Sequence, residues 1–307
     1  MPEFSIIMPC FNAAETLNET IGSLLSQTVP DWELICIDDG STDETPDMLA
    51  GWAEMDKRIR MVTNVGSGPS AARNYGAELA VSATLCFCDA DDLWDTDKLA
   101  CVRRAFEYQS TDAVFGRVAF FHKRGKVDTF STVPNDPLTI DGLLGENPVC
   151  TLSNLSVRRA VFLFNGGFNP SFIHNEDLEW MVRAIGQGAV IHGHREHHVW
   201  YRCSLQGLSS DLTAMQRSRA RVLQQARSFG VTPNRRAEAV YLRYLARRAL
   251  RVKRLSVTPL RLTCAGLWQN PVAFLFPLHR GGATLLAALL AALCAPLFPI
   301  TRHWHFS

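Results

Sequence analysis

The amino-acid sequence predicts an α/β protein with an open, mostly parallel, doubly wound sheet, flanking helices and a basic helical C-terminal extension. Three observations support this prediction. Apolar strand patterns alternate with amphipathic helical patterns up to about residue 108. Polar motifs follow several predicted strands, at the sheet edge where open parallel sheets bind ligands. Beyond residue 211 the alternation stops, and arginine-rich helical segments take its place.

The first part of the chain consists of β–α units. Residues 4–9 (FSIIMP) and 32–37 (WELICI) are short, apolar and partly β-branched, and residues 15–27 between them carry leucines and an isoleucine at helical spacing. A β–α–β unit of this kind predicts parallel pairing. The other predicted elements are, in chain order, a helix at 44–55, a strand at 59–63, a helix at 71–80, a strand at 85–88, a helix at 97–108, a hairpin of 113–121 with 126–130, a helix at 176–185, a strand at 189–194 and basic helices within 213–254.

Composition limits the class of protein. The chain has 307 residues, of which 47% are hydrophobic, enough for a large folded core. Its nine cysteines are scattered and form no C-x-x-C pair, which indicates a reducing compartment rather than a disulfide framework. The first residues, MPEFSIIMPCF, have no basic region and predict a first strand rather than a signal peptide.

Charge divides the chain into two parts. Of its 31 basic and 30 acidic residues, 15 basic residues and one acid fall within 212–307. Residues 1–211 therefore hold 16 basic and 29 acidic residues. Parts of opposite charge in one chain indicate different partners. We expect a domain at 1–211 and a separate basic helical region at 212–307.

The sequence LCFCDADDLW places three carboxylates, Asp89, Asp91 and Asp92, directly after a buried-looking strand. Alternate residues of an extended segment point the same way, so Asp89 and Asp91 can face one site. Carboxylates of this kind hold Mg²⁺ or Mn²⁺ together with substrate phosphates. For the motif alone, an acidic turn that caps the next helix is an equally open alternative.

Two other motifs follow predicted strands. IDDGSTDET (37–45) places Asp38 and Asp39 where they can accept hydrogen bonds from a base or ribose, although capping of the next helix is the better explanation for this motif taken singly. GPSAARN (68–74) opens a helix and places Arg73 near a possible phosphate or carboxylate. The sequence has no G-x-G-x-x-G and no G-x-x-x-x-G-K-[ST], which disfavours dinucleotide and P-loop sites.

Two further clusters carry titratable groups. In HNEDLEWMVRA (174–184), Glu176 and Asp177 begin a helix, where they either complement the helix dipole or supply a general base. The histidines of HGHREHH (192–198) match no tetrahedral zinc spacing, so surface or hydrogen-bonded histidines are the better interpretation.

Four motifs in order, PCFNAAETLNETIGSLLSQTVPDWELICIDDGSTDET, GPSAARN, DADDLW and NEDLEWMVRA, resemble family 2 glycosyltransferases of GT-A fold. The resemblance covers about residues 3–205. It implies an inverting, metal-dependent transfer of a sugar from a nucleotide diphosphate sugar, UDP-linked by resemblance, to a hydroxyl of a glycan or lipid-linked acceptor in cell-surface polysaccharide or glycolipid synthesis.

The resemblance also implies roles for individual residues. Asp177 corresponds to the catalytic base. Either Asp91 or Asp92 corresponds to the ligand of Mn²⁺ or Mg²⁺, because family members shift this motif by one residue. The residues that correspond to the family's nucleotide-sugar site are Pro9, Phe11, Asn12, Asp38, Asp39, Arg73 and Asp89.

The C-terminal region lies outside the resemblance. Residues 282–300 form a run of 19 uncharged, mostly apolar positions, near the roughly 20 that span a bilayer. A membrane span and an interfacial or buried helix are equally compatible with it. The preceding arginines suit anionic lipid headgroups, and no nucleic-acid recognition motif accompanies them. We therefore expect a cytoplasmic enzyme attached to the inner face of the cell membrane.

The sequence also bears on three other functions. Transfer to a polyprenyl phosphate needs less help from a base and belongs to the same family. A non-catalytic nucleotide-sugar-binding protein would not require both DADD and the Glu-Asp pair. A nucleotide-dependent oxidoreductase is disfavoured because the glycine-rich fingerprint is missing. The sequence does not specify the donor sugar, acceptor, linkage or oligomeric state.

Overall fold

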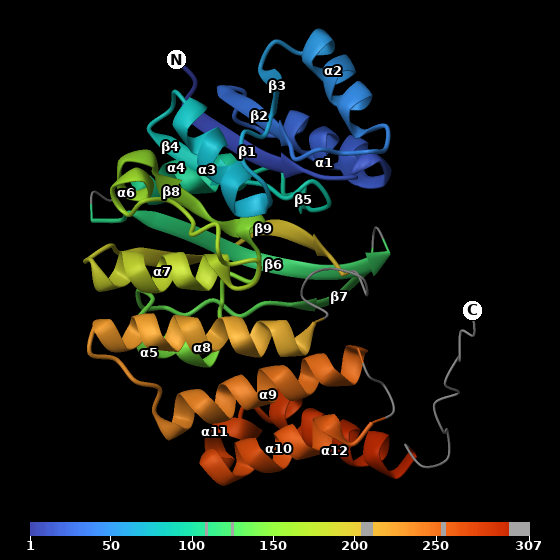
Figure 1. Cartoon of the computed structure of the whole chain (residues 1–307), viewed down its shortest axis with the longest axis vertical. Coiled ribbons are helices and arrows are strands. Elements are labelled where there is room, and N and C mark those ends of the chain that lie inside the picture. The colour runs from blue at the N-terminus through green and yellow to red at the C-terminus, as the bar shows by residue number, and fades with distance from the viewer. Residues whose placement is uncertain (108–109, 124–125, 204–210, 253–255, 295–307) are drawn as a thin grey trace. The chain divides into compact units, whose positions relative to one another are not determined.

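The chain divides into two compact units in the computed structural model (Figure 1), which describes residues 1–107, 110–123, 126–203, 211–252 and 256–294. Unit 1 comprises the described residues of 1–140, 147–203 and 218–229. Unit 2 comprises those of 141–146, 211–217, 230–252 and 256–294. Helix α8 (Leu212–Ser228) contributes to both units.

Unit 1 is built on one sheet, in which nine strands of the described chain take part. The strand order is β3-β2-β1-β4-β8-β6-β9-β5, and β7 pairs with β6. The elements within residues 1–203 are, in chain order, β1 (Phe4–Cys10), α1 (Ala14–Leu25), β2 (Trp32–Asp38), α2 (Thr45–Met55), β3 (Ile59–Thr63), α3 (Pro69–Leu79), β4 (Thr84–Phe87), β5 (Leu93–Trp94), α4 (Lys98–Phe106), β6 (Ala113–Lys123), β7 (Lys126–Phe130), α5 (Ile140–Gly145), the 3₁₀ turn η1 (Leu152–Asn154), β8 (Ser156–Arg158), α6 (Arg159–Phe164), α7 (Glu176–Gly186) and β9 (Ile191–Arg202). Of these, α5 belongs to unit 2 from its second residue on.

The predicted α/β fold is confirmed, and the sheet is mixed. Strands β1, β2, β3 and β4 pair in parallel, as the β–α alternation predicts. Strand β8 is antiparallel to both β4 and β6, while β6 and β9 run parallel. The parallel strands β1, β2 and β4 end at the same sheet edge, so the loops that follow them are brought together.

The helices pack on this sheet through apolar or small side chains. Helix α1 buries Leu17, Ile21 and Leu24 completely, as its spacing predicts. Helix α3 instead presents Gly76, where a Cβ atom would lie 2.5 Å from Ile7 Cγ2 and 2.8 Å from Ile37 Cδ1. The backbone of α3 therefore lies directly against β1 and β2, and its first turn reaches the sheet edge at which β1, β2 and β4 end.

A cluster of four aromatic rings anchors α7. Phe87 on β4 lies 5.2 Å from Phe162 and 5.1 Å from Phe168, measured between ring centroids. Trp180 on α7 completes the cluster, 5.7 Å from Phe162, and is fully buried. Because Trp180 lies one turn after Glu176, this packing holds the acidic N-terminus of α7 at a fixed place relative to β4.

Several elements of unit 1 are too short or too polar for their pattern to be recognised. Strands β5 and β8 have two and three residues, so neither shows a period. Strand β9 continues to Arg202, eight residues beyond the predicted strand at 189–194, because Val199, Trp200 and Tyr201 in its second half pair with β6 and β5. The hairpin of β6 with β7 was predicted correctly.

Unit 2 is helical, as predicted for the basic region. Helix α9 packs against the three helices that follow it. Buried Arg243 of α9 donates to the backbone carbonyls of Ala273 and Phe276 and so fixes the end of α11. These helices are α9 (Arg235–Val252), α10 (Thr258–Gln269), α11 (Pro271–Leu275) and α12 (Leu278–Cys294).

The predicted apolar run at 282–300 lies partly within α12, and its residues 295–300 lie outside the described residues. Within the described part of the chain, no helix combines the length and hydropathy needed to cross a membrane.

Candidate active site

The loops after β1 and β2 are joined by side-chain hydrogen bonds. Asn12 adopts a left-handed backbone conformation with φ +48°, and its Oδ1 accepts from the backbone N–H of Thr42 at 2.8 Å. In return, the Ser41 hydroxyl accepts from the Asn12 N–H at 3.0 Å. Phe11, which directly follows β1, projects outward with 62% of its surface exposed. This exposed ring is available to stack against a planar ligand.

Asp38 and Asp39 have different surroundings. Asp38 is buried, and its carboxylate accepts from the backbone N–H groups of Gly40 and Ser41 at 3.3–3.4 Å, so it stabilises its own turn. Asp39 is partly exposed and accepts from Asn64 Nδ2 at 2.6 Å and from the Gly68 N–H at 2.8 Å. Asp39 therefore links the end of β2 to the start of α3.

The acidic turn after β4 separates its three carboxylates. Asp92 is fully buried; its Oδ1 accepts from the Arg202 N–H at 3.2 Å, and its Oδ2 lies 3.0 Å from the Thr151 hydroxyl. Asp89 is partly exposed, with Oδ1 2.5 Å from Arg73 Nη2 and Oδ2 3.2 Å from the same hydroxyl. Asp91 is exposed, and no other described residue donates a hydrogen bond to its carboxylate.

These carboxylates repel one another, and Asp92 is also shielded from water. Burial, and then the charges of Asp91 and Asp89, raise the pKa of Asp92 well above its usual range. Partial desolvation and the neighbouring charge of Asp89 raise the pKa of Asp91 to about 6. Arg202 and Arg73 lower this pKa from a distance, but no described residue forms an ion pair with Asp91, so a ligand that brings positive charge to it would gain interaction energy.

The first turn of α7 holds Glu176 and Asp177 in different environments. Glu176 Oε1 lies 3.4 Å from Arg73 Nη1, and burial raises the pKa of Glu176 to about 7. Asp177 instead accepts a hydrogen bond from the side-chain amide of Asn147, with Nδ2 2.6 Å from Oδ2. Burial raises the pKa of Asp177, and the bond from Asn147 opposes that rise. The charge of Arg73 also lowers the pKa of Asp177, but no described arginine forms an ion pair with it, so Asp177 keeps proton affinity.

Arg73 connects the two acidic motifs. Its guanidinium is buried and forms ion pairs with Asp89, 16 positions away in the sequence, and with Glu176, 103 positions away. The charges of Asp89, Glu176 and Asp177 raise the pKa of Arg73 against the effect of its burial. The guanidinium stays charged, and it fixes the start of α7 beside the acidic turn.

A buried lysine supports the acidic turn through Ser153. The ammonium of Lys98 donates to the Ser153 carbonyl and lies 3.5 Å from the centroid of the Trp94 ring. The Ser153 hydroxyl in turn accepts from the Asp89 N–H at 2.9 Å. Burial lowers the pKa of Lys98 to about 8. Lys98 thus holds the turn that carries Thr151 and Ser153 against the carboxylates.

Sequence reasoning missed these supporting residues. Asn147, Thr151 and Ser153 lie in the irregular segment ENPVCTLSN, where no period and no motif identifies them. Lys98 lies at the start of a predicted helix, and the sequence alone predicts an exposed side chain for a lysine at such a position. A conserved pattern across relatives would be needed to find them, since their roles arise only from tertiary packing.

The acidic turn has the donor atoms that a hard cation requires. Magnesium and manganese ions bind carboxylate oxygens and commonly complete their shell with substrate phosphates and water. No group of three or more His, Cys, Asp or Glu side chains within the described ranges forms a complete metal site. The exposed carboxylate of Asp91 fits an ion shared with a substrate. Asp92, with both oxygens engaged and its pKa raised, fits a supporting role.

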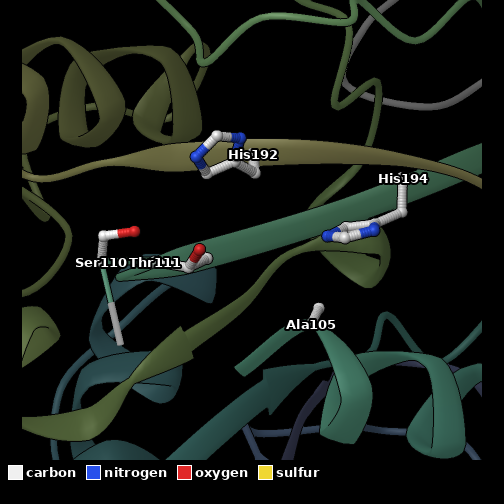
Figure 2. Close-up of a pocket in the computed structure, with 5 residues that line it drawn as sticks. All are labelled: Ala105, Ser110, Thr111, His192 and His194. Atoms are coloured by element: carbon white, nitrogen blue, oxygen red, sulfur yellow. The ribbon is translucent and has the colours of Figure 1, made fainter. Parts of the chain in front are cut away.

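The histidines lie elsewhere. Figure 2 shows a cavity of about 310 Å³ to which β9 contributes His192 and His194, α4 contributes Ala105, and residues 110–111 supply two hydroxyls. This lining shares no residue with the acidic turn or the start of α7. His198 is fully buried, and burial lowers its pKa well below its usual range, so its ring is neutral.

Comparison with known proteins gives consistent results. The family model described as glycosyl transferase family 2 matches residues 5–164, more than half of the chain. TuaG of Bacillus subtilis strain 168, a glycosyltransferase assigned to teichuronic acid biosynthesis, is 30% identical over 212 residues, which are 68% of this chain and 82% of TuaG. WfgD of Escherichia coli, a UDP-Glc:alpha-D-GlcNAc-diphosphoundecaprenol beta-1,3-glucosyltransferase, is 32% identical over 174 residues, 56% of this chain and 66% of WfgD.

Solved structures share the fold at low sequence identity. Staphylococcus aureus TarS 1–349 in complex with UDP-GlcNAc has a TM-score of 0.62 and 15% identity, covering 97% of this chain and 92% of that one. The mannosyltransferase PcManGT from Pyrobaculum calidifontis, in complex with GDP-Man and Mn²⁺, has a TM-score of 0.60 and 17% identity, covering 96% and 87%. The family match and the relatives agree: the chain belongs to glycosyltransferase family 2.

Proposed function

We propose that this glycosyltransferase is a metal-dependent, inverting enzyme that transfers a sugar from a UDP-sugar to a hydroxyl group. One observation carries the proposal. Buried Arg73 forms ion pairs with Asp89 of the acidic turn and Glu176 of α7, so a cation site and a candidate base occupy one region of unit 1. Transfer to a hydroxyl requires both, on either side of the anomeric carbon.

The loops after β1 and β2 form the proposed nucleotide site. The exposed ring of Phe11 would stack on the base, with Pro9 and the strained Asn12 shaping the loop. Asp39, the less buried of the two adjacent carboxylates, would accept a hydrogen bond from the base edge. Asp38 would support it by holding the turn. TarS was solved with UDP-GlcNAc, which supports the choice of UDP.

The diphosphate would lie near the acidic turn. Asp89 would approach the ribose, and Asp91 would be the protein ligand of Mn²⁺ or Mg²⁺, with Asp92 behind it as support. A cation bound there would stabilise the negative charge that develops on the departing nucleoside diphosphate. PcManGT was solved with GDP-Man and Mn²⁺, which is consistent with a metal in this fold.

Asp177 would act as the base toward the acceptor hydroxyl. Its raised pKa favours proton uptake, and the bond from Asn147 at 2.6 Å orients the carboxylate. Glu176 is less suited because Arg73 already pairs with it.

The acceptor would be a lipid-linked glycan at the cytoplasmic face of the membrane, in cell-surface polysaccharide or glycolipid synthesis. WfgD is named for transfer to a diphosphoundecaprenol-linked sugar, and a related Mycobacterium tuberculosis protein, 31% identical over 197 residues, is named for PGL/p-HBAD biosynthesis. In this proposal residues 1–211 catalyse transfer, and residues 212–307 contact the membrane.

A panel of donors tests the proposal. Purified full-length protein is mixed with UDP-glucose, UDP-galactose, UDP-GlcNAc, GDP-mannose or dTDP-rhamnose, with Mn²⁺, Mg²⁺ or EDTA, and nucleotide release is measured. We expect release from one UDP-sugar and its loss in EDTA. If no donor binds or is cleaved under any condition, the proposal is wrong and a non-catalytic role gains support.

The variant Asp177→Asn distinguishes transfer to a hydroxyl acceptor from transfer to a phosphate acceptor. Removing a general base costs about 10²–10⁴ in rate, so transfer to a hydroxyl should fall by that factor while UDP binding, measured by calorimetry, stays unchanged. Asp47→Asn, on α2, is a control for loss of one carboxylate. Near-normal turnover of Asp177→Asn would remove this residue from the mechanism and favour a phosphate acceptor.

A further inference from the structure

Helix α12 presents its large apolar side chains outward. Leu286, Leu289, Leu290 and Leu293, here called the leucine face, have 60%, 42%, 54% and 71% of their surface exposed. Their spacing of three and four residues places them on one side of the helix. The opposite side, buried within unit 2, carries the small residues Gly281, Thr284, Ala288 and Ala291. This is the reverse of an ordinary surface helix, whose large apolar residues face the protein core.

Other exposed apolar residues cluster in the same part of the chain. Among the described residues, ten of the nineteen exposed large apolar side chains fall between residues 252 and 294. They include Trp268 with 80% of its surface exposed, Leu278 with 59% and Phe276 with 56%. Single exposed apolar residues are ordinary, but a concentration of this kind indicates an interaction surface.

We propose that α12 lies in one leaflet of an anionic bilayer, parallel to its plane, with the leucine face inserted among the acyl chains. The described helix has 17 residues, which at 1.5 Å per residue is about 25 Å, shorter than the roughly 30 Å of a hydrocarbon core. Insertion along the surface also lets the buried small-residue side remain packed on unit 2, which a spanning orientation would expose to lipid.

The charge of this region selects an anionic membrane. Residues 212–307 carry 15 basic residues and one acid. Arg235, Arg236, Arg251 and Arg261 are exposed on α9 and α10. Basic residues near an anionic surface each strengthen its attraction, whereas two copies of this region would repel one another. The charge therefore favours lipid over a second copy as the partner of the leucine face.

The inference deepens the proposed function, since a lipid-linked acceptor lies at the same surface. The two remain separable because the leucine face belongs to unit 2, while donor cleavage is assigned to residues of unit 1. A protein that cleaves the donor but ignores vesicles would contradict only this inference. A protein that binds vesicles but cleaves no donor would contradict only the proposed function.

Vesicle flotation provides the test. Full-length protein is mixed with vesicles of phosphatidylcholine alone, or of phosphatidylcholine with about one third phosphatidylglycerol, and the bound fraction is measured. We expect binding to the anionic vesicles that weakens as NaCl is raised, because the arginine contribution is screened. The triple variant Leu286→Ser, Leu290→Ser, Leu293→Ser should bind at least about 100-fold more weakly.

The control is Val81→Ser with Phe164→Ser, which removes two exposed apolar side chains of unit 1, 54% and 81% exposed. It should bind vesicles like the wild type, and both variants should keep the wild-type melting temperature and donor cleavage. Equal vesicle binding by the wild type and the triple variant would overturn the inference. So would a wild-type dimer, detected by light scattering, that the triple variant dissociates while vesicle binding is absent.

Discussion

The hydrogen bond from Asn147 to Asp177 should control the pH at which the enzyme becomes active. Asn147 Nδ2 lies 2.6 Å from Asp177 Oδ2, and this donation lowers the pKa of Asp177 while burial raises it. In Asn147→Ala one of the groups that oppose the effect of burial is lost, while the backbone N–H of Leu178 and the charge of Arg73 still lower the pKa of Asp177, so the carboxylate stays protonated to a higher pH than in the wild type. A hydrogen bond to a charged group contributes about 1.5–3 kcal/mol, which corresponds to about 10- to 100-fold in proton affinity.

The sign follows from the role of the base. Asp177 must be deprotonated to accept a proton from the acceptor hydroxyl, so the rate rises with pH through the pKa of Asp177. The acid limb of kcat/KM should therefore move to higher pH in Asn147→Ala. Within that limb, the variant should be about 10- to 100-fold slower than the wild type, and the two rates should converge above it.

The assay is nucleotide release with donor and acceptor present, measured from pH 5 to pH 9. Asn165→Ala is the matched control, because buried Asn165 donates its side-chain amide to the Val161 carbonyl at 2.8 Å, outside the site. It should lower the unfolding free energy without moving the pH profile. If Asn147→Ala lowers the rate equally at every pH, Asn147 acts only by stabilising its turn, and the assignment of Asp177 loses its main support.

Two further predictions concern the acidic turn. Asp91→Asn should lower metal-stimulated donor cleavage by about 100-fold or more with little change in unfolding free energy. Asp92→Asn should retain more activity, because buried Asp92 supports the turn. If both variants lose the same activity when the metal ion is titrated, this division of roles is wrong. Burial lowers the pKa of Lys98 from 10.5 to about 8, so the unfolded chain holds this proton to a higher pH than the folded chain. Between pH 7 and pH 9 the unfolding free energy of the wild type should therefore rise by about 1.4 kcal/mol relative to that of Lys98→Met. If urea unfolding gives the same difference between the two proteins at pH 7 and at pH 9, the prediction is wrong.

The sequence predicted the parallel part of the sheet well because local patterns determine it. Residues 4–10 and 32–38 are apolar throughout most of their length, and the helices between strands show clear periods. Strands β5 and β8 and the second half of β9 were missed, since they owe their conformation to pairing with distant strands rather than to their own residues.

The candidate site divides in the same way. Its acidic residues follow from motifs at strand ends and a helix start, and the structure places Arg73 between Asp89 and Glu176. The motif could not distinguish Asp91 from Asp92, because that difference is one of burial. Asp92 is covered by contacts with Thr151 and the backbone of Arg202, both far from it in sequence.

The distribution of charge explains why donor binding and a cation should be linked. Residues 1–211 have 13 more acids than bases, and three of these acids lie close together in the acidic turn, where burial and mutual repulsion raise the pKa values of Asp91 and Asp92. A nucleotide diphosphate is itself an anion, so its approach to Asp91 would be repulsive unless positive charge accompanied it. Arg73 and Lys98 do not meet this need, because both are buried and already engaged with protein groups. We therefore predict that a cation arrives with the donor at the proposed UDP-sugar site, so that the affinity for UDP falls in EDTA even where no sugar is transferred.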